Sequence, residues 1–225
     1  MIDACRGLVR SGLTHGKSGN VSVRRDAGSF FISPTGMPYE ALESADIPLV
    51  HIDGRWYGRR RPSSEWRFHR DIFAARDAVA AIVHTHSPKA TSLACTARGI
   101  PAFHYMVAVA GGTEIRCAPY HIFGTQELSD AAIAALEGRN ACLLANHGVI
   151  SVGKSLSAAL TLAGEVENLA AQYCTALAIG HVRILEDGEM QPVIEKFRTY
   201  GSQEATDSGL NFGGPELPET ARTGR

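Results

Sequence analysis

Two short apolar runs that each lead into histidine constrain the fold of this chain more than any other feature. One run covers residues 80–86 and ends in His84-Thr85-His86, and the other covers residues 142–145 and is followed by Asn146-His147-Gly148. Apolar runs of this length, bounded by turn residues, predict buried strands rather than helices. A sheet must therefore run through the middle of the chain, and both of these strands end in polar side chains.

Further short strands and several helices are predicted around these two runs. The other strands are expected at residues 21–23, 29–33 and 50–52 and at Ile115 and Cys117. Helices are expected at residues 2–13, 66–76, 88–97, 127–136 and 155–180, and a short helix or turn at residues 195–200. This mixture favours an α/β fold with a helix–sheet–helix layering and a mixed, mostly antiparallel sheet, in one domain through residue 201. Residues 202–225 are rich in Gly, Pro, Glu and Thr, which predicts a C-terminal tail that is mobile or wraps on a neighbouring chain.

The charge balance and the cysteines exclude several classes of protein. The 22 Lys and Arg residues against 23 Asp and Glu residues leave no global field that would attract nucleic acid or an acidic membrane surface. No apolar run approaches the ~20 residues of a membrane-spanning helix. The five cysteines are widely spread and include no C-x-x-C pair, which favours free thiols in a reducing compartment over a disulfide scaffold. We therefore expect a soluble cytoplasmic protein with no nucleic-acid or membrane partner.

Three histidines are the candidate metal ligands. His84 and His86 stand two residues apart on a predicted strand, so both imidazoles project from the same face. His147 ends a second buried strand, and neighbouring strands that end at one level would bring it beside the pair. Three histidines with an open fourth position are typical of catalytic zinc. The alternative for His84 and His86 alone is a pair of strand-end histidines that face solvent.

Glu65 is the candidate fourth ligand. It follows Ser63-Ser64 at the start of a predicted helix, where a carboxylate is favoured electrostatically in any protein. That ordinary role is one interpretation. The functional interpretation is a weak metal ligand that substrate displaces, after which the carboxylate is free to move a proton.

Three turns are candidate anion sites: Gly19-Asn20, Thr35-Gly36 and Ser63-Ser64. Each combines a small flexible residue with a hydroxyl or amide group, and the last lies at a helix N-terminus, where backbone N–H groups bind phosphate. Lys17 precedes the first turn and adds a possible charge contact. Ordinary turn chemistry explains any one of these turns alone.

Longer strings of residues resemble a known family. The chain is similar to the class II aldolase/adducin family, in its L-fuculose-1-phosphate aldolase branch, over nearly all of its length to residue 201. The strings that carry the resemblance are Pro62-Ser63-Ser64-Glu65-Trp66-Arg67-Phe68-His69, Ile100-Pro101-Ala102-Phe103-His104-Tyr105-Met106, Cys117-Ala118-Pro119-Tyr120, Phe123-Gly124-Thr125, Asn146-His147-Gly148 and Lys196-Phe197-Arg198-Thr199-Tyr200-Gly201.

The resemblance implies an α/β/α fold around a nine-stranded sheet and a homotetramer with active sites between subunits. It implies one Zn²⁺ per chain, or another divalent metal, held by His84, His86, His147 and Glu65, with Glu65 also acting as the proton-transfer base. It implies that Tyr105 and Tyr200 are catalytic and that Phe123 lines the aldehyde pocket. The implied phosphate-binding residues are Gly19, Asn20, Thr35, Gly36, Ser63 and Ser64.

The function expected from these residues is zinc-dependent cleavage of a ketose 1-phosphate to dihydroxyacetone phosphate and an aldehyde. The substrate would be L-fuculose 1-phosphate or a related deoxy-sugar phosphate. The alternatives are a sugar-phosphate 4-epimerase, a decarboxylase or dehydratase on the same scaffold, and a metal-free adducin-type binding module. The three histidines disfavour the last. A Schiff-base aldolase is disfavoured because all four lysines lie at turns or helix edges.

Overall fold

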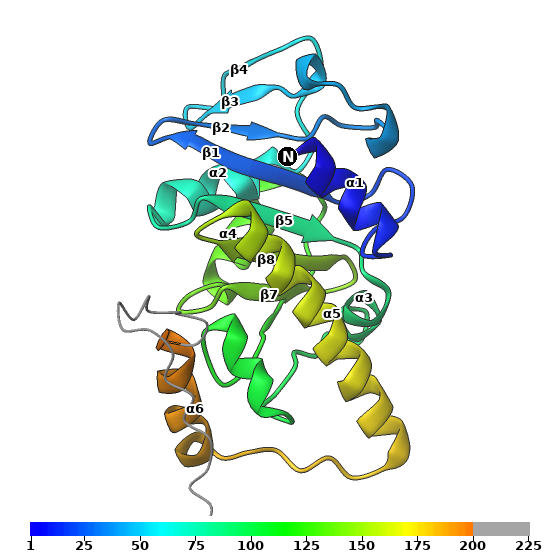
Figure 1. Cartoon of the computed structure of the whole chain (residues 1–225), viewed down its shortest axis with the longest axis vertical. Helices are drawn as coiled ribbons and strands as arrows, with labels where there is room; N and C mark the ends of the chain where they lie inside the picture. Colours follow the sequence, from blue (N-terminus) through cyan, green and yellow to red (C-terminus); the bar gives the residue numbers. More distant parts are fainter. Residues whose placement is uncertain (200–225) are drawn as a thin grey trace, which may run out of the picture.

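The computed structural model describes the backbone of residues 1–199 and the side chains of residues 1–197. Its strands form one sheet. They are β1 (Asn20–Asp26), β2 (Ser29–Ile32), β3 (Leu49–His51), β4 (Trp56–Tyr57), β5 (Ala81–Thr85), β6 (Cys117–Ala118), β7 (Ala141–Leu144) and β8 (Gly148–Gly153). The strand order is β4-β3-β2-β1-β5-β8-β7-β6, and β6 with β7 is the one parallel pair in this sheet (Figure 1). The predicted mixed, mostly antiparallel sheet is confirmed.

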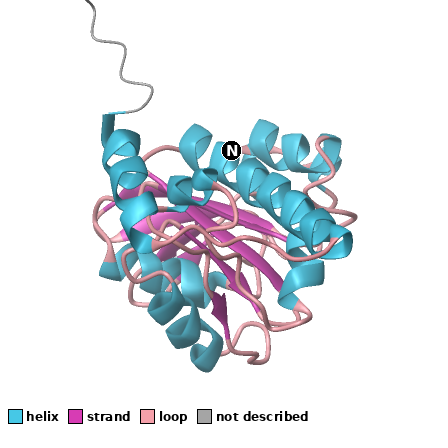
Figure 2. Cartoon of the chain, turned by 90° about the horizontal axis from the view of Figure 1, so that it is seen from below, coloured by secondary structure: helices cyan, strands magenta, loops and turns pink. Residues whose placement is uncertain are grey.

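Helices cover both faces of this sheet. They are α1 (Ile2–Arg10), α2 (Trp66–Ala75), α3 (Pro88–Ala94), α4 (Gln126–Ala135), α5 (Leu156–Ile179) and α6 (Asp187–Thr199), with 3₁₀ turns η1 (Tyr39–Ala41), η2 (Ser44–Asp46) and η3 (Tyr105–Ala110). One apolar core joins α2 and α4 to one face of the sheet. Two further cores join α1, α3 and α5 to the other face. Figure 2 shows the strands between the two helical layers, so the predicted α/β/α layering is confirmed.

Three local predictions were wrong. Residues 1–199 contain eight strands rather than nine. Strand β8 was not predicted, because Gly148 was interpreted as the end of a strand and not as the start of the next one. Helix α6 begins at Asp187 rather than at residue 195. Pro192 lies inside α6, and a proline at that position predicts the end of a helix, so the sequence does not indicate the start at Asp187. The burial of Met190 against Ala102 and Ala108 stabilises the helix. Tyr200 and the predicted tail at 202–225 lie outside the described residues.

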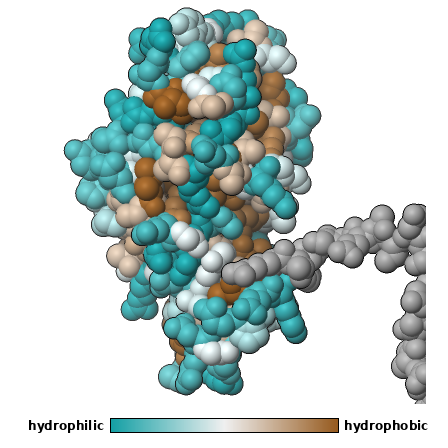
Figure 3. All heavy atoms as spheres, turned by 90° about the vertical axis from the view of Figure 1, so that its left-hand side faces the viewer, coloured by the Kyte–Doolittle hydropathy of each residue, from teal (hydrophilic) through white to brown (hydrophobic). Residues whose placement is uncertain are grey.

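The longest helix, α5, is a core element. The Ser155 hydroxyl accepts a hydrogen bond from the Ala158 N–H at 3.1 Å and so caps its N-terminus, while Leu162, Val166 and Leu169 are buried against the sheet. None of the helices within residues 1–199 is long and apolar enough to cross a membrane. On the side of the molecule shown in Figure 3, hydrophobic atoms form patches that are interrupted by hydrophilic ones.

The sheet register brings three distant segments together at one end of β5. His84 on β5 pairs with Asn20 on β1 and with Ile150 on β8. The turn before β1 approaches the same strand so closely that a Cβ atom on Gly19 would lie 2.7 Å from the carbonyl oxygen of His84. The backbone of Gly19 also has a φ of +79°, which L-residues other than glycine rarely adopt. Glycine is therefore required here for two separate reasons.

A pair of substitutions separates these two reasons. Gly16 has a comparable φ of +63°, but a Cβ atom added there would meet no atom within 4 Å. Gly16→Ala should therefore lower the free energy of unfolding only by the ~1–2 kcal/mol of left-handed backbone strain. Gly19→Ala should cost a further ~1–3 kcal/mol, because its methyl group overlaps the β5 backbone. Denaturant unfolding of both variants measures the difference, and equal losses would contradict the proposed close approach.

Candidate active site

The three predicted histidine ligands lie together around one point. Their candidate ligand atoms all lie within 4.8 Å of one another, and the ring centroids are 4.9–5.0 Å apart. His84 Nε2 is 3.1 Å from His86 Nε2. Glu65 completes the group, with its Oε2 atom 3.2 Å from His84 Nε2 and its Oε1 atom 3.0 Å from His147 Nε2. In this group the structure brings together residues from β5, the β7–β8 turn and the start of α2.

This geometry fits a divalent metal. Four ligands at ~2.0–2.1 Å from a tetrahedral Zn²⁺ stand roughly 3.3 Å from one another, close to the three separations of 3.0–3.2 Å given above. His84 Nδ1–H donates to the Val149 carbonyl at 2.9 Å, which turns Nε2 toward the other members of the group. The cysteines play no part in the group. Cys142 is fully buried in the core of the α2–α4 side, as the alternation along its strand predicts.

The protonation states also suit metal binding. Burial opposes ionisation of Glu65, but the nearby charge of His84 and the hydrogen bonds from His147 and His84 outweigh it and hold the pKa of this carboxyl well below its usual range. Burial, followed by the charges of His84 and His147, lowers the pKa of His86 to about 4. The carboxylate is therefore ionised at neutral pH and His86 is neutral, and these are the forms that coordinate a cation.

Gly148 allows the strands that carry the histidines to approach each other. A Cβ atom at this position would overlap the Thr85 carbonyl oxygen and would lie 2.9 Å from Cδ2 of His86. The preceding Asn146 has a φ of +56°, so the chain turns sharply just before His147. The sequence Asn146-His147-Gly148 therefore combines the turn, the ligand and the small residue in three consecutive positions.

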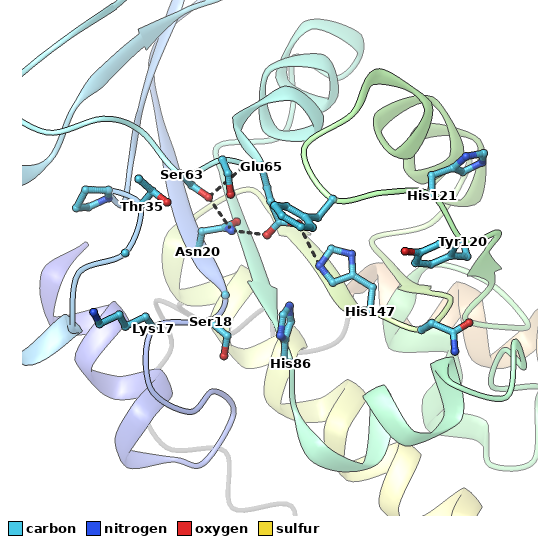
Figure 4. Close-up of a pocket in the computed structure, with 16 residues that line it drawn as sticks. Lys17, Ser18, Asn20, Thr35, Ser63, Glu65, His86, Tyr120, His121 and His147 are labelled. Atoms are coloured by element: carbon cyan, nitrogen blue, oxygen red, sulfur yellow. Dashed lines mark hydrogen bonds and ion pairs between the residues drawn. The ribbon is translucent and has the colours of Figure 1, made fainter.

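A cavity of about 300 Å³ opens beside the histidines (Figure 4). It is lined by the predicted turn residues Gly19, Asn20, Thr35, Gly36, Ser63 and Ser64, by Lys17 and Ser18, by Glu65, His86 and His147, and by Pro34, Tyr120, His121, Phe123 and Asn146. The turns lie on one side of the metal ligands and Tyr120 and His121 on the other. One cavity thus combines the three candidate anion-binding turns, the candidate metal ligands and a partly aromatic wall.

The loop that carries Phe123 is hydrogen-bonded to α2. The Phe123 side chain is 64% exposed, so it stands at the rim of the cavity. The Arg67 guanidinium donates to the Gly124 carbonyl at 2.7 Å and holds this loop against the helix. Sequence reasoning missed His121 as a cavity residue, although it lies between two of the strings that carry the family resemblance.

Asn20 differs from the other turn residues because its side chain is turned into the protein. It is only 2% exposed, and its Nδ2 atom donates to Ser63 Oγ at 3.0 Å and to Glu65 Oε2 at 2.9 Å. Both amide hydrogens are therefore used within the chain. The side chain of Asn20 holds Glu65, and the hydroxyl of Ser63 belongs to the same network.

Tyr105, one of the two predicted catalytic tyrosines, does not join this site in the single chain. Tyr105 lies on η3 with half of its side chain exposed, and it does not line the cavity. Tyr200 lies outside the described residues. Tyr105 therefore lies away from the candidate metal ligands of its own chain.

Comparison with known proteins agrees with this geometry. Residues 1–174 match the model of the class II aldolase and adducin N-terminal domain family. The chain is 54% identical over 201 residues to a 5-methylthioribulose-1-phosphate/5-deoxyribulose-1-phosphate aldolase of Rhodospirillum rubrum, covering 89% of this chain and 90% of that protein. It is 47% identical over 202 residues to the L-fuculose phosphate aldolase of Escherichia coli K12, covering 89% of this chain and 94% of that one.

A solved structure is similar over the same extent. An L-fuculose 1-phosphate aldolase superimposes with a TM-score of 0.84 at 41% sequence identity, covering 88% of this chain and 93% of that chain. The sequence match, the shared fold and the cluster of histidines all lie in the same part of the chain. The chain therefore belongs to the class II aldolase and adducin family, and within that family it is a class II aldolase, a carbon–carbon lyase.

Proposed function

We propose that this chain is a zinc-dependent aldolase that cleaves a ketose 1-phosphate to dihydroxyacetone phosphate and an aldehyde. The observation that carries the proposal is the shared cavity, in which the anion-binding turns and the metal ligands lie side by side. The phosphate-bearing half of a ketose would lie on the turns, with its carbonyl at the metal ligands and its far end toward the aromatic wall.

The residues of the chain divide the chemistry between them. A Zn²⁺ ion held by His84, His86 and His147 would supply Lewis-acid stabilisation of the negative charge that develops on the carbonyl oxygen. Glu65 is ionised and already lies among the ligands, so it serves as the group that accepts and returns the proton. Backbone N–H groups and hydroxyls of the turns hold the phosphate, and Lys17 at the cavity rim adds a positive charge.

The far end of the substrate is proposed to be apolar. Two aromatic side chains, Tyr120 and Phe123, line the same cavity as the turns, and an aromatic lining suits a methyl or methylthio group better than a charged one. The names of the two curated relatives point to the same class, since both act on deoxy-sugar or methylthio-sugar phosphates. A second phosphate at this end, as in a retained epimerase intermediate, would find few partners there.

We also propose that the protein is a cytoplasmic homotetramer with its active sites between subunits. Tyr105 is half-exposed and lies outside the cavity of its own chain, so it can reach substrate only from a second copy. Tyr200 is proposed to close the aldehyde pocket. The five free cysteines fit a reducing compartment. The molar mass of the assembly in solution tests the tetramer, and a monomeric active enzyme would contradict it.

Product analysis tests the activity itself. The metal-loaded enzyme should release dihydroxyacetone phosphate and free aldehyde from 5-deoxyribulose 1-phosphate, 5-methylthioribulose 1-phosphate and L-fuculose 1-phosphate. We expect kcat/KM to be about tenfold higher for 5-methylthioribulose 1-phosphate than for 5-deoxyribulose 1-phosphate, since burying its additional methylthio group contributes ~1 kcal/mol or more. Conversion of a pentulose 5-phosphate to its epimer, without free aldehyde, would show an epimerase instead.

Removal of a ligand should abolish metal binding. We expect the purified protein to carry about one divalent ion per chain, and His84→Ala to lose it together with activity, by roughly 10²- to 10⁴-fold. Elemental analysis and turnover measure both effects. His181→Ala, which changes an exposed histidine outside the cluster, is the control and should keep metal and activity. Full turnover of the wild-type protein in excess chelator would refute metal catalysis.

Two adjacent serines should behave differently in the phosphate site. Ser64 is exposed to the cavity, so Ser64→Ala should raise KM for the phosphorylated ketose about ten- to a hundredfold and leave kcat and metal content unchanged. Ser63→Ala should also lower kcat, because Ser63 Oγ accepts the hydrogen bond from the amide of Asn20. Steady-state kinetics separates the two effects. An equal rise in KM for the unphosphorylated ketose would mean that Ser64 does not contact phosphate.

A further inference from the structure

We propose that His69 is a positioning residue that fixes the orientation of the Asn20 amide and, through it, the Glu65 carboxylate. His69 does not line the cavity and touches none of the metal ligands by hydrogen bond. The kinetic consequence of this inference rests on the proposed aldolase function, whereas its structural part does not.

His69 is placed between two elements that carry the site. It lies on α2, four residues after Glu65, and its side chain is fully buried. Asn20 and Ser22 stand two residues apart on β1, so their side chains project from the same face of the sheet. The imidazole bridges them: Nδ1 lies 2.6 Å from Ser22 Oγ, and Nε2 contacts Asn20 Oδ1.

The orientation of the Asn20 amide decides where each proton in this chain of hydrogen bonds lies. Its Nδ2 atom donates to both Ser63 Oγ and Glu65 Oε2. The Oδ1 atom of Asn20 then faces His69, and Nε2 of His69 must carry a hydrogen. Burial, which is the largest cause, lowers the pKa of His69 to about 3, so the ring is neutral and carries one hydrogen only. Nδ1 is therefore an acceptor, and the Ser22 hydroxyl donates to it.

The other tautomer of the His69 ring, or a rotated Asn20 amide, would place two acceptors or two donors against each other in this chain of hydrogen bonds. With Nδ1–H in place of Nε2–H, the ring would present a lone pair to Asn20 Oδ1, and two acceptors would face each other. The amide could relieve this contact only by rotating, which would turn its oxygen toward Glu65. The Ser22 hydroxyl can donate to Nδ1 or accept from it, so the acceptor-only oxygen of Asn20 is the atom that fixes the tautomer, while Ser22 holds the ring in place. The buried pair Ser22 and His69 thus holds Glu65 in the rotamer that reaches both His84 and His147.

The alternative is that His69 only fills space beneath α2. Its ring stacks on Phe68 with centroids 4.6 Å apart, and Ile72 is buried one turn further along the same helix. A filling role predicts lower stability with no specific effect on the site. Ile72→Val therefore serves as the matched control, because it removes one buried methyl group from the same helix without removing a hydrogen bond.

A set of variants tests the coupling by kinetics and metal content. His69→Leu should lower kcat or metal affinity about ten- to a hundredfold with KM changed by less than about threefold, the usual effect of losing a partner that orients a metal ligand. His69→Gln retains an N–H donor at the Nε2 position and should recover most of this loss. The double variant His69→Leu/Asn20→Ala should be no worse than Asn20→Ala alone, since His69 acts through Asn20. Additive losses, or an equal loss in Ile72→Val, would overturn the proposal.

A measurement that requires no activity tests the proton positions. Nitrogen chemical shifts of the ¹⁵N-histidine-labelled full-length protein should show Nε2 of His69 protonated and Nδ1 unprotonated, and Ser22→Ala should shift Nδ1 specifically. An Nδ1–H tautomer or an imidazolium ring would overturn the inference. If the wild-type enzyme cleaves no ketose phosphate, the proposed function fails while these shifts still decide the role of His69.

Discussion

A carboxylate that is removed from water must be surrounded by hydrogen-bond donors or by positive charge. Glu65 is only 7% exposed, and it meets this requirement through His84, His147 and the amide of Asn20. The same contacts place it where it can share a metal with the histidines or exchange a proton with a substrate. The other polar groups at this end of the sheet are arranged to satisfy this one charge, and a metal ion would satisfy it more completely.

The sheet holds this arrangement because its register joins segments that are far apart in the chain. Strand β5 lies between β1 and β8, so Asn20, His84 and the chain that follows His147 meet at one level. The close approach of their backbones leaves no room for side chains at Gly19 and Gly148. The two glycines are thus part of the site although neither provides a functional group.

The cavity separates recognition of the phosphate from recognition of the far end of the substrate. The turns at Gly19, Thr35 and Ser64 offer backbone donors and hydroxyls on one side, Tyr120 and His121 lie on the other side, and the loop that carries Phe123 also lines the cavity. That loop is attached to α2 through Arg67, the same helix that begins beside Glu65. A change of substrate within this family could therefore arise in the loop without any change at the metal ligands.

Local patterns in the sequence determined the type of most elements and the residues that share a face. The two-residue period of a strand placed His84 beside His86, and the helix start after Ser63-Ser64 placed Glu65 at an N-terminus; the α/β/α layering also followed from the pattern of elements. Strand β8, the early start of α6 and the role of His69 were decided only by tertiary structure. Gly148 resembles a strand end until β7 and β8 pair, and Pro192 resembles a helix end until Met190 is buried. Nothing near His69 in the chain indicates that Ser22 and Asn20 will face it, because hydrogen bonds between segments more than 40 residues apart depend on the sheet register and not on local periodicity.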